Sequence, residues 1–269
     1  MAAAPLPTGP AGTPEPPVAP SPRAAARRPR VVVERGIVRY DALRTDRWKA
    51  NGTVKVSGEL VVGSGDVTGT LSVGGALSAG TFRSRGTLEV EGAVRVRELL
   101  SSRGDLRCAT TVRAGDLSLH GTASFGGPVT VDRTCALRGT LHAPAVAAGI
   151  LEFDGSVSIP GEVCARNVLA EFRHRSMLGS VLARQVRLRG RVPNLMDKAF
   201  FHLDPATVGR IEADSVELES VDVAFVRAKE IVLGRQAHVT ALEGTVVRHH
   251  PSSSVGPRSK SPPPYGLRR

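Results

Sequence analysis

The sequence predicts an all-β protein folded as a β-solenoid, in which each strand-rich coil stacks on the next. Three observations lead to this fold class: glycine recurs every 16 to 18 residues, apolar and polar residues alternate after each glycine, and aromatic residues make up only 4% of the chain. A fixed repeat of this length is typical of solenoids, and alternation with period two is typical of strands that bury one face. The repeated glycines are Gly52, Gly69, Gly86, Gly104, Gly121, Gly139 and Gly155, with Gly190 after a coil that lacks one.

The chain begins with a segment, residues 1–30, that is rich in proline and alanine and has no periodic apolar face. Such a composition does not bury enough apolar surface to offset the entropy of ordering, so we expect a disordered basic tail. The next segment, 31–51, is expected to form an N-terminal cap or a first, irregular coil.

The repeats span 52–247, and this range is predicted to form the β-helix domain. Glycine inside a helix costs about 1 kcal/mol relative to alanine, whereas at a corner between short strands it supplies backbone angles that other residues avoid. The second and fourth residues after each glycine form two apolar columns, which we expect to point inward. The core and assembly residues predicted in this way are Leu71, Val73, Leu88, Val90, Leu106, Phe125, Leu141 and Ile159.

An interruption, 191–207 ("RVPNLMDKAFFHLDPAT"), separates the main block of repeats from the last coils. Its apolar residues have the spacing of one face of a short helix. Two roles are open for this face, which either packs on the side of the solenoid or forms a surface for a partner or a second copy. The residues of this candidate partner surface are Met196, Phe200, Phe201 and Leu203.

The last segment, 248–269, is rich in proline, serine and arginine and is expected to form a second disordered basic tail. The first tail carries four arginines and one glutamate, and the second carries five basic and no acidic residues, so +8 of the net charge of +11 lies in the tails. The tails either keep the protein soluble or contact an anionic membrane, a nucleic acid or envelope proteins.

A basic column is predicted along one corner of the solenoid, formed by the residue before each repeated glycine. If the stacking is regular, these side chains lie about 4.8 Å apart on successive coils. The column is either a solvated edge or a binding site for a polyanion. Its four successive basic members are Arg85, Arg103, His120 and Arg138.

The sequence shows no constellation that is typical of an enzyme. His120, His142 and His174 occupy different positions in their coils, so stacking does not bring them into one site. The glycine-rich stretch "GSGDVTG" (63–69) lacks the lysine of a phosphate-binding loop. We therefore expect no catalytic site, no metal, no cofactor and no small-molecule substrate.

The cysteines and the hydropathy indicate the cellular compartment. Cys108, Cys135 and Cys164 lack the spacing of a disulfide framework or a zinc site, so we expect structural roles. No stretch approaches the roughly 18 apolar residues of a membrane span, and the first residues lack the apolar region of a secretory signal. We expect a cytoplasmic protein, with membrane association through the tails as the alternative.

The short coils "GTLxVxG" and "VxAxxLxLxG", enclosed by proline-rich basic tails, resemble bactofilins, the polymer-forming cytoskeletal proteins of bacteria. The resemblance covers about 52–247, and "IEADSVELESVDVAFVRAKEIVLG" (211–234) is similar to the last coils of the longer members. It implies a right-handed, roughly triangular β-helix that assembles end to end into nucleotide-independent filaments. Such a homopolymer would scaffold envelope- or chromosome-associated processes. The alternative is a non-polymerising solenoid adaptor that presents its basic tails to a membrane, nucleic-acid or protein partner.

Overall fold

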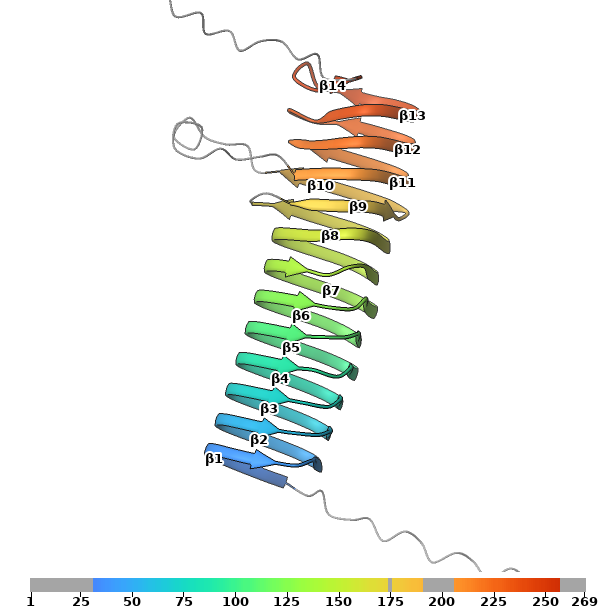
Figure 1. Ribbon diagram of the computed structural model, residues 1–269. Helices are drawn as coiled ribbons and strands as arrows, with labels where there is room; N and C mark the ends of the chain where they lie inside the picture. Colours follow the sequence, from blue (N-terminus) through green and yellow to red (C-terminus); the bar gives the residue numbers. More distant parts are fainter. Residues whose placement is uncertain (1–30, 174–175, 191–205, 257–269) are drawn as a thin grey trace, which may run out of the picture.

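The computed structural model describes residues 31–173, 176–190 and 206–256. They form a parallel β-solenoid of about 12 turns, which confirms the predicted fold class (Figure 1). The 14 strands of these described ranges all belong to one sheet that winds around the solenoid. The strands are β1 (Val31–Tyr40), β2 (Leu43–Val56), β3 (Leu60–Val73), β4 (Leu77–Val90), β5 (Val94–Cys108), β6 (Val112–Phe125), β7 (Val129–His142), β8 (Val146–Phe172), β9 (Met177–Leu182), β10 (Gln185–Gly190), β11 (Ala206–Glu219), β12 (Val221–Leu233), β13 (His238–His249) and β14 (Ser254–Val255).

The repeated glycines stack directly on one another. Gly52 pairs with Gly69, and Gly69 with Gly86, so each coil returns to the same corner after 17 residues. The backbone there adopts φ of +131° at Gly52 and +115° at Gly69, a region that other residues rarely enter. A Cβ atom on Gly69 would lie 2.2 Å from the carbonyl oxygen of Gly52. Glycine is therefore needed both for the corner angle and for the close approach of the coil below.

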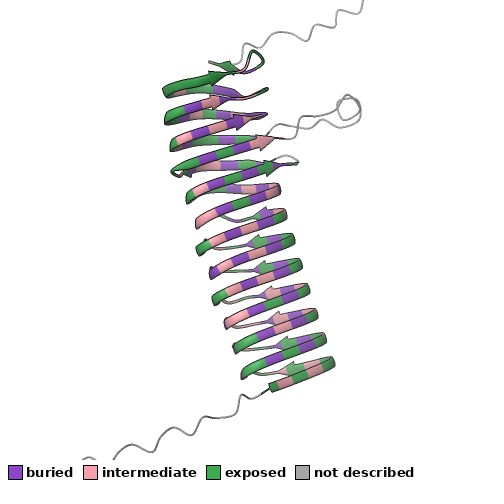
Figure 2. Cartoon of the chain, turned by 180° about the vertical axis from the view of Figure 1, so that it is seen from behind, coloured by how far each residue is buried: buried purple, intermediate pink, exposed green. Residues whose placement is uncertain are grey.

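The interior of the solenoid is a continuous apolar column, in which inward residues alternate with exposed ones along each strand (Figure 2). The eight predicted core residues all lie in it, with exposures of at most 4%: Leu71, Val73, Leu88, Val90, Leu106, Phe125, Leu141 and Ile159. The aromatic side chains are accommodated by small neighbours. A Cβ on Gly65 would lie 2.6 Å from the Phe82 ring, so the glycine of one coil makes room for the phenylalanine of the next.

The coil without a glycine turns the same corner with Phe172. This side chain is 3% exposed and packs against Phe153, with ring centroids 6.2 Å apart. Its backbone stacks under Gly190, so the register of the coils continues through this position.

The interruption leaves the stack intact. β10 pairs with β11 in register, although the two strands are separated by residues 191–205, and β9 pairs with both β8 and β11. The predicted surface of Met196, Phe200, Phe201 and Leu203 lies outside the described residues. The last two residues of the predicted interruption, Ala206 and Thr207, belong to β11.

Both ends of the solenoid differ from the sequence-based boundaries. The segment 31–51, expected as a cap or an irregular coil, is a regular coil in which β1 pairs with β2 without any shift in register. At the other end, β13 continues to His249 and β14 pairs with it at Ser254 and Val255. Residues 248–256 therefore belong to the solenoid, although the sequence assigned them to the tail.

Candidate functional site

The four basic residues predicted to share a corner lie on four successive strands. Arg85 of β4 pairs with Arg103 of β5, Arg103 with His120 of β6, and His120 with Arg138 of β7. All four side chains are exposed. Parallel strands lie about 4.8 Å apart, so the charged groups follow one another at that spacing along the solenoid axis. We call these four residues the basic edge.

The basic edge has few acidic neighbours. Its three arginines make no ion pair with any of the described residues. Two residues before Arg85 on the same strand, Arg83 is also exposed and adds a further positive charge. On the other side of the corner, the residues that directly follow the repeated glycines are Asp105, Thr122 and Thr140. Asp105 is thus the one acidic residue next to the edge in β4 to β7.

Further along the same column, charges of opposite sign are paired. Both oxygens of Asp154 accept hydrogen bonds from Arg173, which lies on the next coil, with the Nη2 to Oδ2 distance at 2.6 Å. Arg189 contacts Glu217 at 3.3 Å and Glu219 at 3.6 Å. The column therefore has two parts, a paired C-terminal part and the unpaired basic edge.

A groove lined by both acidic and basic residues adjoins the C-terminal end of the basic edge. His120 and Arg138 line one side, Arg187 and Arg189 line the other, and Glu152, Asp154 and Glu171 lie between them. The groove also contains Leu169, which is 42% exposed. A second, more apolar groove lies over β8, β9 and β11 to β13, where Met177 is 46% exposed. In the second groove, Nδ1 of the lining residue His238 lies in hydrogen-bond contact with Ser254 Oγ at 2.7 Å.

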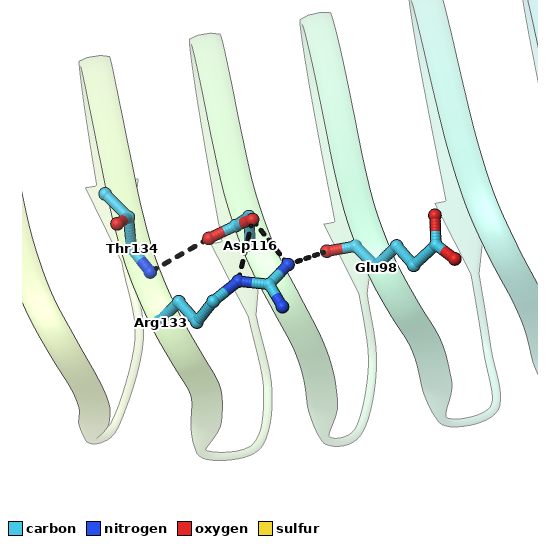
Figure 3. A network of polar contacts seen from close by, with 4 residues as sticks. All are labelled: Glu98, Asp116, Arg133 and Thr134. Carbon is cyan, nitrogen blue, oxygen red and sulfur yellow. Dashed lines mark hydrogen bonds and ion pairs between the residues drawn. The ribbon is translucent and has the colours of Figure 1, made fainter.

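A polar network at another corner joins three coils (Figure 3). Arg133 donates to Asp116 Oδ2 from Nη2 at 2.6 Å and from Nε at 3.1 Å, and its Nη2 also donates to the carbonyl oxygen of Glu98 at 3.3 Å. Asp116 Oδ1 accepts a hydrogen bond from the backbone N–H of Thr134 at 3.1 Å. The hydrogen bonds from Arg133 hold the pKa of Asp116 below its usual range.

This network lies where the longer coils take up their extra residue. The strand register shifts between Val96 and Leu99 and again between Val131 and Thr134. These shifts are bulges, which leave backbone groups without a partner in the strand ladder. Arg133 and Asp116 bond to such groups. The 18-residue steps in the sequence are the signal that locates the bulges, but they do not reveal which side chains fill them.

The cysteines are protonated thiols at neutral pH. Burial raises the pKa of Cys135 to about 12, and a hydrogen bond with Glu162 is the largest factor that raises the pKa of Cys164 to about 11. Burial also raises the pKa of Cys108. Because the thiolate is the reactive form, these residues are poor nucleophiles.

Of the histidines named in the sequence analysis, the two that the structure describes, His120 and His142, lie apart. His120 lies before a corner glycine and His142 three residues after one, on different columns, and His174 lies outside the described residues. Within the described ranges, no group of three or more histidine, cysteine, aspartate or glutamate side chains has the arrangement of a metal site.

The two terminal coils leave inward side chains partly uncovered. At the N-terminal end, Val38 and Tyr40 of β1 are half-buried, whereas their partners in β2, Val54 and Val56, are 1% and 0% exposed. At the other end, Val246 of β13 is 38% exposed, whereas its partner Ile231 in β12 is fully buried. The inward columns therefore reach solvent at both ends of the described solenoid.

No family model, curated protein or solved structure matches the chain. Among the described residues, no helix has the length and apolar character required to cross a bilayer. The described part of the chain is thus a repeat solenoid with charged edges and two open ends.

Proposed function

We propose that this protein is a structural, self-assembling polymer of the bactofilin type, in which copies stack end to end and scaffold other cellular components. The observation that carries the proposal is the partial exposure of inward residues at both terminal coils. An added coil would bury these apolar residues in the same way as an internal coil does. Burial of apolar surface contributes roughly 25 cal/mol per Å², which favours such contact.

The backbone of the terminal strands supports the same conclusion. Within the described residues, β1 pairs only with β2, and the far edge of β13 is covered only by the two residues of β14. Unpaired strand edges present N–H and C=O groups that form a template for a further strand.

The proposed contact involves backbone hydrogen bonds and apolar side chains. Since no phosphate group takes part, assembly is expected without ATP, GTP or metal. Sedimentation and negative-stain electron microscopy of the full chain test this, and filaments or sheets are the expected result. A protein that stays monomeric at micromolar concentration and moderate salt would favour the non-polymerising adaptor instead.

A substitution at the open end gives a sharper test. Val38→Lys places a charge where a stacked coil would bury it, while in the free protein the lysine still reaches solvent. We expect this variant to keep its circular dichroism spectrum and to lose end-to-end assembly. The matched control is Ile37→Lys, which adds the same charge to an outward position of the same strand. Equal assembly of both variants would contradict stacking through the β1 end.

A further inference from the structure

The basic edge is a straight, narrow row of positive charge on the side of the solenoid, away from both proposed assembly ends. It spans four coils, β4 to β7, which corresponds to about 14 Å at the usual strand spacing. At about 4.8 Å, neighbouring charges lie within the Debye length of about 8 Å at physiological salt, so they repel one another. The fold gains no stability from this alignment.

The paired part of the same column shows how this repulsion is avoided elsewhere. There, Asp154 is bonded to Arg173, and Arg189 contacts two glutamates. In the basic edge, by contrast, Arg85, Arg103 and Arg138 form no ion pair among the described residues. Arg138 is in register with Asp154 of the next coil, but that carboxylate is bonded to Arg173. An external anion would supply the missing negative charge.

The shape of the edge favours a linear polyanion over a flat anionic surface. A lipid bilayer would meet several columns at once, including the acidic residues Glu152 and Asp154 just beyond Arg138. Strands β4 to β7, which are described throughout, expose no large apolar side chain for insertion into lipid. Beside the edge lie the small residues Ser101, Ser118 and Ala136, which leave room for a chain along it.

We propose that Arg85, Arg103, His120 and Arg138 bind the phosphate backbone of a nucleic acid. Arginine suits this role because its planar guanidinium forms bidentate hydrogen bonds with phosphate oxygens. The aromatic side chains of β4 to β7, Phe82 and Phe125, are buried, so none is available to stack on a base. Binding is therefore independent of base sequence. It does not depend on the proposed assembly, because the edge lies on the side of the coils.

The binding is expected to fall steeply with salt, because each neutralised phosphate releases counterions. Three arginine contacts correspond to a slope of about −2.7 in log K against log salt on duplex DNA. Raising the salt from about 50 mM to about 200 mM then weakens this part of the binding by about 40-fold.

The test uses the full chain and a short fluorescent DNA duplex, titrated at several salt concentrations. The variant Arg85→Gln, Arg103→Gln, Arg138→Gln is compared with the control variant Arg39→Gln, Arg166→Gln, Arg235→Gln. The control removes the same charge from exposed arginines on three separate coils that also make no ion pair among the described residues. The basic-edge variant is expected to bind about tenfold more weakly or worse at low salt, with the slope reduced by about 3. The control is expected to bind nearly as wild type.

Two results would overturn the proposal. If the two variants bind the duplex equally, the tails or the net charge carry the binding rather than the basic edge. If the basic-edge variant loses binding to phosphatidylserine vesicles but keeps its affinity for the duplex, the edge recognises lipid. Unchanged circular dichroism spectra of both variants ensure that the comparison reports on binding.

Discussion

At the scale of single residues, each repeated glycine meets two separate demands. Gly86 adopts φ of +119°, and a Cβ there would lie 2.2 Å from the carbonyl oxygen of Gly69. Gly36, in the first coil, adopts φ of +87° but has nothing within 4 Å of its missing Cβ. The two positions therefore separate the cost of the backbone angle from the cost of the close contact.

We expect Gly86→Ala to destabilise the protein more than Gly36→Ala. The strained angle costs about 1–3 kcal/mol at either position, and Gly86→Ala adds a backbone clash that requires two coils to move apart. Urea denaturation followed by circular dichroism measures both. Similar midpoints for the two variants would show that the coils are not held as closely at the corner as the structure indicates.

A charge in the interior is expected to be far more damaging than one on the surface. Phe125 and Val90 are 4% and 3% exposed in a column that has no room for water. Phe125→Arg or Val90→Arg is expected to cost several kcal/mol and to prevent soluble, native-like folding. Ser124→Arg, at the exposed neighbouring position of the same strand, is the control and is expected to be nearly neutral. Native-like thermal melting of all three would contradict the register of the coils.

At the scale of strands, the bulged corners depend on side chains for their hydrogen bonds. Asp116 and Arg133 bind the backbone of Thr134 and Glu98, on the coils to either side of Asp116. These interactions connect coils that differ in length by one residue. The corner is thus held by a few polar contacts, whereas the flat strands are held by a regular ladder.

The ion pair at this corner gives a pH-dependent prediction. The folded state lowers the pKa of Asp116, so the pair stabilises the protein above the unfolded carboxyl pKa of about 3.9. This contribution is lost as the pH falls through the lower, folded pKa. We expect Asp116→Asn to lower the urea midpoint at neutral pH, with a difference from wild type that shrinks below about pH 4.

The control for this prediction is Asp105→Asn. Asp105 is exposed and makes no ion pair among the described residues, so its substitution is expected to have a small effect at every pH. If Asp116→Asn also has the same effect at neutral and acid pH, its carboxylate does not act through the ion pair.

At the scale of the whole molecule, each coil contacts mainly the coils directly before and after it. Stability in such solenoids is close to a sum over neighbouring repeats, so the end coils are the least stable. The two ends here are also where inward residues such as Val38 and Val246 remain partly exposed. Local unfolding of the end coils and end-to-end assembly are therefore expected to involve the same strands.

Hydrogen exchange measured by mass spectrometry tests this link. In dilute protein we expect the amides of β1 and β13 to exchange faster than those of β4 to β7, because local opening begins at the ends. Assembly is expected to slow exchange in β1 and β13 and to leave the central strands nearly unchanged. Protection confined to the sides of the central coils would instead indicate lateral association.

The sequence by itself determined the repeat, the strand class and the inward columns. Each coil repeats the same local demands, a glycine at the corner and alternating apolar residues after it. Leu71, Val90 and Ile159 could therefore be placed in the core from their distance to a glycine, and the basic column of Arg85 and Arg103 from the same register.

Only the tertiary structure decided which side chains complete the irregular parts. The contact of Arg133 with Asp116 and Glu98 joins residues 17 and 35 positions apart, and it forms because two bulges come to lie on either side of one coil. Likewise, the regular pairing of 31–51 and the inclusion of 248–256 depend on the neighbouring coil, whose strand supplies hydrogen-bond partners that composition does not reveal. Periodic sequence encodes periodic structure, whereas bulges and ends are set by contacts between coils.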